Sequence, residues 1–159
     1  DLVTEIIDHP RICPHLHLPL QSGDQRILDA MGRGHMLHEY RELVEAATEA
    51  DPDTAIGTDI MVGFPGETDR SHANTMDFLK SLPLAYLHIF SYSPRAGTRA
   101  ASMSGRPDGT VTKTRLRELK KLDKAIRASF RESQIGRERQ FVLETNPQAK
   151  AAFAAARAE

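Results

Sequence analysis

The sequence alternates three times between an apolar stretch typical of a buried strand, a polar loop, and an amphipathic stretch typical of a helix. The expected strands cover residues 15–20, 55–62 and 84–90, and the helices that follow them cover about 39–50, 68–81 and 112–134. Strands that alternate with helices in this way form a parallel sheet. The pattern therefore predicts the α/β class, as half of an (α/β) barrel or as a piece of a doubly wound sheet.

Three polar loops follow these strands, at residues 21–24, 63–68 and 91–98. Parallel strands bring their carboxyl ends to one edge of the sheet, so the three loops are expected to lie close together. In both architectures this edge is where ligands bind. The sequence thus predicts a ligand site at the carboxyl edge.

The loop 63–68 (GFPGET) gives the most specific signal of the three for ligand binding. A glycine at a strand end lets a ligand approach the backbone, and a helix beginning at Thr68 offers free N–H groups to an anion. Six such residues on their own are more typical of an ordinary turn between strand and helix. Gln21 and Ser22 suit ribose hydroxyls or a carboxylate, and Arg95 could pair with a carboxylate or phosphate. An arginine that only caps the sheet edge would give the same pattern.

Two histidines, His15 and His17, are two residues apart on the first strand and therefore point to the same face. Together with a carboxylate such as Asp59 they could hold zinc or iron. No third ligand stands at a telling spacing, and His88 is isolated in the sequence. We therefore favour a structural role for these histidines and predict neither a metal ligand nor a catalytic residue.

Cys13 is the only cysteine, which excludes a disulfide within the chain and a metal site made of cysteines alone. A reducing, cytoplasmic setting fits this composition, and we expect Cys13 to be a small buried residue at the start of a strand. No apolar run approaches the roughly 20 residues of a membrane span. We therefore expect no membrane partner.

The net charge of −1 hides a strong asymmetry. Residues 1–112 carry 9 Lys and Arg against 16 Asp and Glu, whereas residues 113–139 carry 10 against 4. Most charged helix faces are merely solvated, but this excess modestly favours contact with a nucleic acid. Aromatic residues that would stack on bases are not interleaved with these charges.

Four motifs, taken in order, resemble the second half of the radical S-adenosylmethionine (SAM) domain of tRNA methylthiotransferases. They read CPHLHLPLQSG, RILDAMGR followed by EYRELV, TDIMVGFPGET, and YSPRAGT. The resemblance covers about residues 3–145. The segment LPLAYLHIFSYSPRAGT is most similar to the threonylcarbamoyladenosine tRNA methylthiotransferases, and the group acting on isopentenyladenosine is a close second.

This resemblance implies strands four to six of a partial (α/β)6 barrel. In the family, a [4Fe-4S] cluster held by a CxxxCxxC motif cleaves SAM to a 5′-deoxyadenosyl radical, and a second cluster takes part in sulfur delivery. The product carries a methylthio group on carbon 2 of N6-threonylcarbamoyladenosine next to the anticodon. The implied partners are the anticodon stem-loop of tRNA and an amino-terminal half that holds the clusters.

The resemblance also implies which residues contact SAM, all of them in the three loops. Gln21 and Ser22 would lie near the ribose or methionine part, and the segment 62–64 would lie against the adenine. The third loop would add contacts in the same pocket. The complete set is Gln21, Ser22, Val62, Gly63, Phe64, Tyr92, Ser93 and Arg95.

The cysteines that bind the clusters are absent, so we expect this chain to be an inactive fragment by itself. We expect residues 1–136 to form the half-barrel, 137–145 to begin a truncated RNA-binding TRAM-like domain, and 146–159 to form an alanine-rich tail. Two other hypotheses remain open. The chain could be a non-catalytic module that binds RNA or a protein partner, or a half-barrel completed by a separately encoded amino-terminal half.

Overall fold

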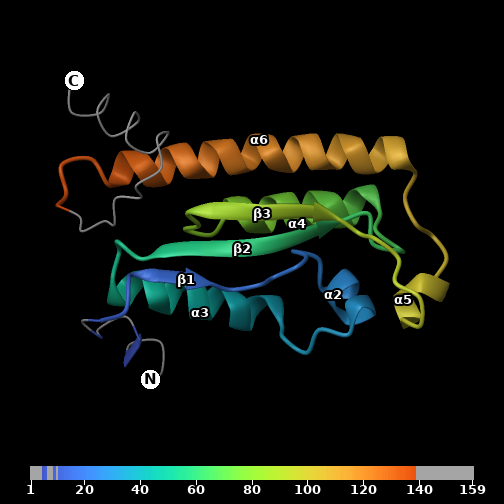
Figure 1. Cartoon of the computed structure of the whole chain (residues 1–159), viewed down its shortest axis with the longest axis horizontal. Coiled ribbons are helices and arrows are strands. Elements are labelled where there is room, and N and C mark those ends of the chain that lie inside the picture. Colours follow the sequence, from blue (N-terminus) through green and yellow to red (C-terminus); the bar gives the residue numbers. More distant parts are fainter. Residues whose placement is uncertain (1–4, 7–8, 10, 139–159) are drawn as a thin grey trace, which may run out of the picture.

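The computed structural model describes residues 5–6, 9 and 11–138. Three strands, β1 (His15–His17), β2 (Ala55–Val62) and β3 (Tyr86–Ser91), form a parallel sheet in the order β1-β2-β3 (Figure 1). In the register, Gly57 pairs with His17 on one side and with Tyr86 on the other. The predicted strands and their parallel arrangement are confirmed, although β1 ends three residues before the expected boundary.

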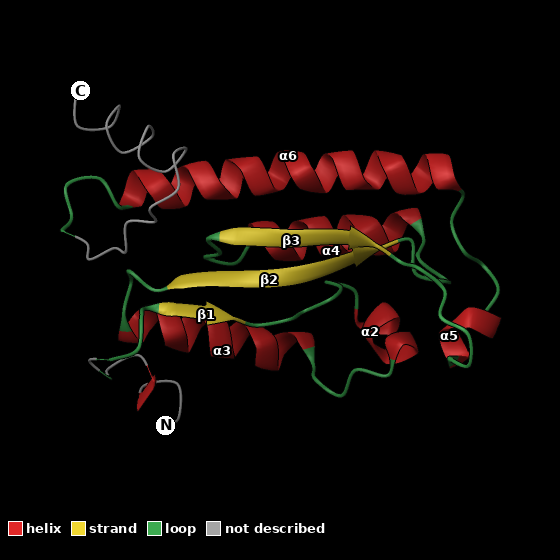
Figure 2. Cartoon of the chain, in the orientation of Figure 1, coloured by secondary structure: helices red, strands yellow, loops and turns green. Residues whose placement is uncertain are grey.

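Five helices accompany this sheet in the described part of the chain (Figure 2). They are α2 (Gln25–Met31), α3 (Leu37–Ala50), α4 (Asp69–Lys80), α5 (Arg99–Ser102) and α6 (Gly109–Ser133). The three helices predicted after the strands are confirmed within about three residues. The short α5 falls in a region that the sequence predicted as a loop.

Side chains at the helix starts explain these boundaries. Asp24 accepts a hydrogen bond from the Ile27 N–H at 3.2 Å, and Thr68 accepts one from the Ser71 N–H at 3.1 Å. Such capping satisfies N–H groups that have no partner within the helix. Helix α2 ends at Gly32, whose φ of 75° is a left-handed conformation that glycine adopts without strain.

The hydrophobic core lies on one face of the sheet, between the strands and the helices. Alternate residues of β2 point into it, and they pack against α3, α4 and α6. Its fully buried members include Leu20, Leu28, Val44, Ile56, Ile60, Leu79 and Leu119. Figure 1 views the sheet from the opposite face, with α3 and α4 behind it.

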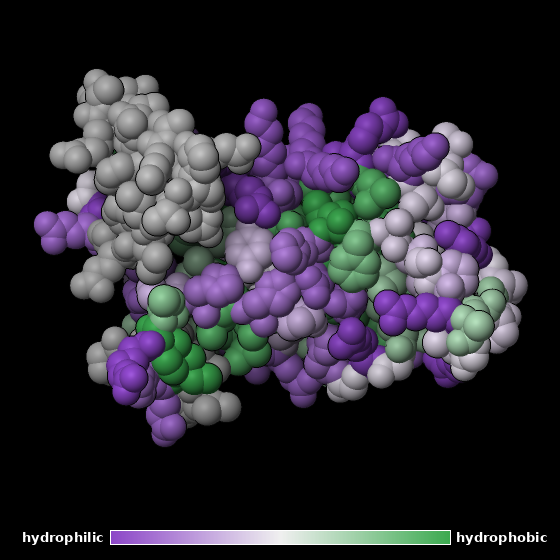
Figure 3. Space-filling model, viewed as in Figure 1, coloured by the Kyte–Doolittle hydropathy of each residue, from purple (hydrophilic) through white to green (hydrophobic). Residues whose placement is uncertain are grey.

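That opposite face is polar and uncovered in the described structure. Hydrophilic side chains gather over the middle of the sheet in the space-filling view (Figure 3). A doubly wound sheet would carry helices on both faces, whereas the strands of a barrel carry them on the outside only. Among the described residues, the arrangement is therefore consistent with a segment of a barrel.

Helix α6 lies along β3 (Figure 1) and is attached to it by polar contacts. The Leu87 N–H donates to Asp123 Oδ1 at 2.7 Å, and Arg127 donates to the Leu87 carbonyl oxygen at 3.4 Å. The Arg127 guanidinium also lies 5.1 Å from the centre of the Tyr86 ring. These contacts orient the helix on the last strand.

The expectation of a buried Cys13 is wrong, because the structure exposes this residue. It lies in the segment before β1, which begins only at His15. The expected TRAM-like start at 137–145 lies outside the described residues except for 137 and 138, and the tail 146–159 lies wholly outside them. Within the described part, no helix is long and apolar enough to cross a membrane.

Candidate functional site

The carboxyl edge of the sheet is shaped first by Gln21. Its N–H donates to the Asp59 carbonyl oxygen at 2.8 Å, and its carbonyl accepts from the Met61 N–H at 3.0 Å. These bonds hold Gln21 at a φ of 76°, a left-handed conformation that is uncommon for a residue other than glycine. A strained backbone conformation persists only where the surrounding structure fixes it, and such residues are found most often at functional sites.

Beneath this edge, the Tyr40 phenol links the residue that follows β1 to β2 by hydrogen bonds. Its oxygen lies 2.7 Å from the Leu18 carbonyl oxygen and 3.0 Å from Thr58 Oγ1. Burial raises the pKa of Tyr40 to about 12, and the nearby Asp59 charge acts in the same direction. The phenol therefore stays protonated and can keep its hydrogen bonds at neutral pH.

Ser22 faces the protein interior and not the open edge. Its hydroxyl lies 3.4 Å from Thr75 Oγ1 and accepts from the Asp24 N–H at 3.2 Å. The Gly23 N–H donates to the same Thr75 oxygen at 3.1 Å. These contacts attach the first loop to α4, so the Ser22 side chain has a structural role here.

The loop 63–68 is held by its own carboxylate. Gly63 has a φ of 81°, and its N–H donates to the Glu67 carboxylate. Glu67 in turn lies 3.2 Å from the buried guanidinium of Arg115 on α6. The Glu67 carboxylate therefore occupies the N–H of the glycine at which a ligand was expected to approach the backbone.

Phe64 and Tyr92 form an apolar cluster where the second and third loops meet. Their rings pack edge to face with centres 5.4 Å apart, against Ile27. Tyr92 is 92% buried, yet its hydroxyl has no hydrogen-bond partner among the described residues. A buried polar atom without a partner is costly and indicates a place where a ligand or water completes the site.

Beside this cluster is a cavity of about 390 Å³ at the carboxyl ends of β2 and β3. Its lining consists of Met61, Phe90, Ser91, Tyr92, Ser93, Arg95, Thr98 and Ala100. The structure thus brings together Tyr92, Ser93 and Arg95 of the predicted set. The other five, Gln21, Ser22, Val62, Gly63 and Phe64, lie at the same edge but do not line this cavity.

Met61 and Phe90 were missed as site residues, although the sequence held a signal for them. They are register partners on neighbouring strands and follow Asp59 and His88 on the uncovered face. Period-two alternation from His88 would have placed Phe90 there. Pairing Phe90 with Met61, however, requires the strand register, which sequence periodicity does not provide.

The residues of this cavity fit part of SAM. Apolar side chains of Met61, Phe90 and Tyr92 offer a surface for a planar base, and Arg95 can pair with a carboxylate. An iron–sulfur cluster does not fit, because clusters are held by several cysteine thiolates and the chain has one cysteine.

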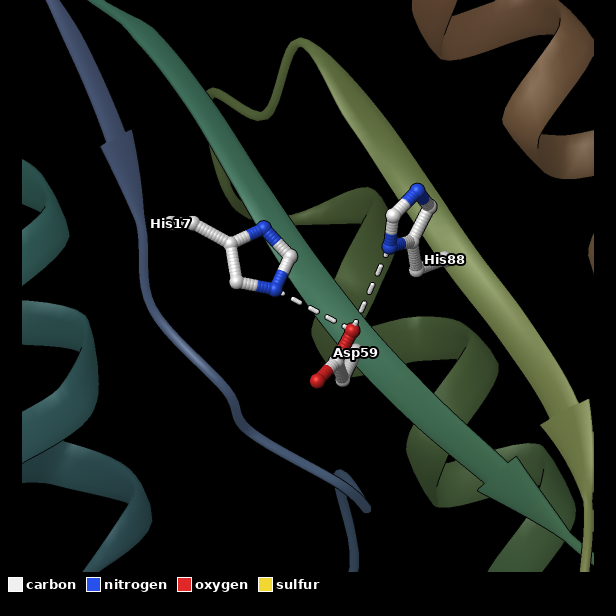
Figure 4. A group of neighbouring side chains, drawn as sticks. All are labelled: His17, Asp59 and His88. Carbon is white, nitrogen blue, oxygen red and sulfur yellow. Dashed lines mark hydrogen bonds and ion pairs between the residues drawn. The ribbon is translucent and has the colours of Figure 1, made fainter.

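A second polar group lies on the uncovered face, nearer the middle of the strands. His15 and His17 do share a face, as predicted, and the Tyr86 hydroxyl lies 2.8 Å from His15 Nε2 and 3.1 Å from His17 Nδ1. His17 Nε2 lies 3.1 Å from Asp59 Oδ1, and His88 Nδ1 lies 3.6 Å from the same oxygen (Figure 4). His88, which the sequence left isolated, therefore belongs to this group.

Comparison with known proteins identifies the class. Residues 1–79 match the family described as the Radical SAM superfamily. The described α/β fold with its parallel sheet is consistent with this match, and the chain belongs to this superfamily.

Within the superfamily, the chain is similar to tRNA methylthiotransferases. The chain is 42% identical over 147 residues to the threonylcarbamoyladenosine tRNA methylthiotransferase MtaB of Aquifex aeolicus, covering 92% of the chain and 36% of that protein. It is 38% identical over 144 residues to MtaB of Thermotoga maritima, covering 91% and 33%. It is 41% identical over 140 residues to the tRNA-2-methylthio-N(6)-dimethylallyladenosine synthase of Paracoccus denitrificans, covering 87% and 31%. The chain thus spans about a third of the length of these relatives.

Proposed function

We propose that this chain provides strands four to six of the radical SAM barrel in a tRNA methylthiotransferase. Its activity would place a methylthio group on carbon 2 of N6-threonylcarbamoyladenosine next to the anticodon. The observation that carries the proposal is the cavity at the carboxyl edge, which is lined by three residues that the family likeness implies, Tyr92, Ser93 and Arg95. The buried hydroxyl of Tyr92 has no hydrogen-bond partner among the described residues. The chain's similarity to MtaB proteins over more than nine-tenths of its length supports the choice of substrate.

In this role the chain's own residues bind and orient SAM. Arg95 is exposed at the rim of the cavity and would hold the SAM carboxylate, because a guanidinium pairs with carboxylates bidentately. Met61, Phe90 and Tyr92 would form the apolar support for the adenine. Phe64 would hold the Tyr92 ring by edge-to-face packing, and Gln21 would fix the loop beside the ribose. SAM bound at this edge would supply the radical chemistry of the family, together with an iron–sulfur cluster that this chain does not hold.

The amino-terminal half that would hold the clusters is a proposed partner, and it would join at β1. In the described part of the chain no strand pairs with β1 on the side away from β2. An unpaired parallel edge is a template for a further strand. We propose a cytoplasmic location for the assembled protein, as tRNA modification requires access to tRNA.

Transfer RNA is the second proposed partner, through α6. Six basic residues of this helix are exposed: Lys113, Arg117, Lys120, Lys121, Lys124 and Arg131. Basic side chains at this density attract phosphates and give affinity that falls with salt. A gel-shift titration with tRNA at two salt concentrations would test this contact, and loss of all binding at the higher one would indicate charge attraction without recognition.

A chimeric enzyme tests the proposed reaction. The matching segment of the Aquifex aeolicus relative would be replaced by this chain, and the tRNA nucleosides of a strain lacking 2-methylthio modification would be analysed by mass spectrometry. We expect 2-methylthio-N6-threonylcarbamoyladenosine. The variant R95A should lower the product, whereas R11A, an exposed arginine before β1, should not.

Two outcomes would contradict the proposal. A folded chimera that retains its iron absorbance but makes no methylthio product would refute the reaction. Product formed only on the dimethylallyl-type adenosine would instead support the second candidate, which the Paracoccus denitrificans relative favours.

A further inference from the structure

We propose that His17, Asp59 and His88 form a binding site for a divalent transition metal ion, distinct from the carboxyl-edge cavity and beyond the function proposed above. The three side chains come from three neighbouring strands and converge on the uncovered face of the sheet (Figure 4). One ligand atom from each lies within 4.8 Å of the other two. Two imidazoles and one carboxylate are a common ligand set for zinc and for iron.

Strand register explains why these residues meet. Asp59 and His88 are direct partners on β2 and β3, and His17 on β1 pairs with Gly57, two residues before Asp59. Residues at direct and diagonal positions on one face of a sheet lie within reach of each other. The ligand set is therefore built on regular strands, which hold side chains more firmly than loops do.

The spacing of the ligand atoms fits a metal ion with small adjustments. Zinc binds nitrogen at about 2.0–2.1 Å and oxygen at about 2.0–2.2 Å, which puts tetrahedral ligand atoms roughly 3.3–3.5 Å apart. His17 Nε2 and His88 Nδ1 lie 3.1 and 3.6 Å from Asp59 Oδ1. The His88 side chain is 67% exposed, so its ring can rotate to bring its ligand nitrogen closer to the ligand atoms of His17 and Asp59.

Tyr86 orients His17 from behind, as an outer-shell partner of a metal ligand does. Its hydroxyl lies 3.1 Å from His17 Nδ1, and this reach depends on Gly57. A Cβ at Gly57 would stand 2.0 Å from the Tyr86 ring, so only glycine lets the ring cross β2 to the histidines. Gln21 contributes in a similar way by donating to Asp59 Oδ2 at 3.5 Å.

A bound metal ion would take the place of the proton shared by His17 Nε2 and Asp59 Oδ1, which lie at hydrogen-bond distance, 3.1 Å apart. The Tyr86 hydroxyl lies within hydrogen-bond distance of His15 Nε2 and His17 Nδ1. When Tyr86 accepts from the Nδ1–H of His17, the Nε2 lone pair of His17 is available to the metal ion.

The ligand types define which ions would bind. Imidazole nitrogens favour zinc, cobalt, nickel, copper and iron over magnesium and calcium, which prefer oxygen. Three protein ligands leave a coordination position open toward the uncovered side of the sheet. Sites with an open position can take a water molecule or a polar ligand, whereas closed four-ligand sites are structural.

Calorimetric titration of the tag-free full chain with ZnCl₂ at neutral pH tests the site, with Co²⁺ absorption as a second readout. We expect one saturable site whose affinity falls at least about tenfold in H88A and in D59N. H88A removes an exposed ring and D59N preserves the shape of the side chain, so circular dichroism should show both variants folded. Y86F should weaken binding while leaving the ligands in place.

Two variants serve as matched controls. H38A removes an exposed histidine of α3, and C13S removes the exposed thiol; both should bind Zn²⁺ like the unaltered chain. The proposal is overturned if the chain shows no saturable binding. It is also overturned if H88A and D59N bind like the controls, in which case the histidines form only a hydrogen-bonded chain. Neither result depends on methylthiotransferase activity, so the two proposals fail separately.

Discussion

The buried ion pair between Arg115 and Glu67 should make a large contribution to the stability of this fold. Arg115 is 5% exposed and lies 3.2 Å from Glu67 Oε1, whose side chain is 8% exposed. Replacing Arg115 with methionine would leave the Glu67 carboxylate buried; among the described residues, the Gly63 N–H and His72, 4.0 Å away, would remain near it. Removing one partner of a buried ion pair typically costs about 3–5 kcal/mol.

Urea unfolding followed by circular dichroism measures this cost. We expect R115M to lower the free energy of unfolding by about 3–5 kcal/mol and the melting temperature by about 6–20 °C. D69N is the matched control. Asp69 also pairs with Arg115, at 2.6 Å, but its side chain is 98% exposed, so the loss should stay below about 1 kcal/mol.

The double variant R115M/E67Q tests the reasoning itself. If the cost of R115M comes from the stranded carboxylate, making Glu67 neutral should restore much of the lost stability. A loss below about 1 kcal/mol in R115M would refute the reasoning. So would a double variant in which the two losses simply add.

Three further outcomes follow from the structure. The alkaline absorbance titration should contain one phenol with a pKa of about 12, and Y40F should remove it. Because folding raises this pKa from 10.0, its contribution to stability is complete below pH 10 and is lost as the pH rises toward 12, a loss that Y40F should reduce. The Thr110 N–H lowers the pKa of Asp108 at the start of α6, so helicity should fall as acid protonates this carboxyl, and D108A should show a smaller change on acidification. L79A should cost about 2–5 kcal/mol in urea unfolding, because Leu79 is fully buried in the core.

Local sequence signals were sufficient for most of the fold. Period-two and helical periodicities, with capping residues such as Asp24 and Thr68, located the strands and the helices that follow them. These signals act over a few residues and do not depend on distant contacts. Helix α5 was missed because it has only four residues and no buried side chain.

The candidate site was less predictable, because side-chain direction depends on tertiary contacts. The loops were placed at the right edge, yet Ser22 turned inward to Thr75, and Glu67 took the glycine N–H that was expected to face a ligand. His88 joined His17 only through strand register, which the sequence alone does not fix. Buried Cys13 was a wrong expectation for the same reason, since burial depends on what covers a segment.

The attachment of α6 to β3 makes the two edges of the sheet unequal. Asp123 and Arg127 engage the N–H and the carbonyl of Leu87 on the side away from β2, where a fourth strand would otherwise pair. Side chains of a helix thus occupy the outer N–H and carbonyl of β3 at Leu87, whereas in the described part of the chain no strand pairs with the outer side of β1. A protein that extends this sheet would therefore meet a free strand edge at β1 and the side chains of α6 at β3.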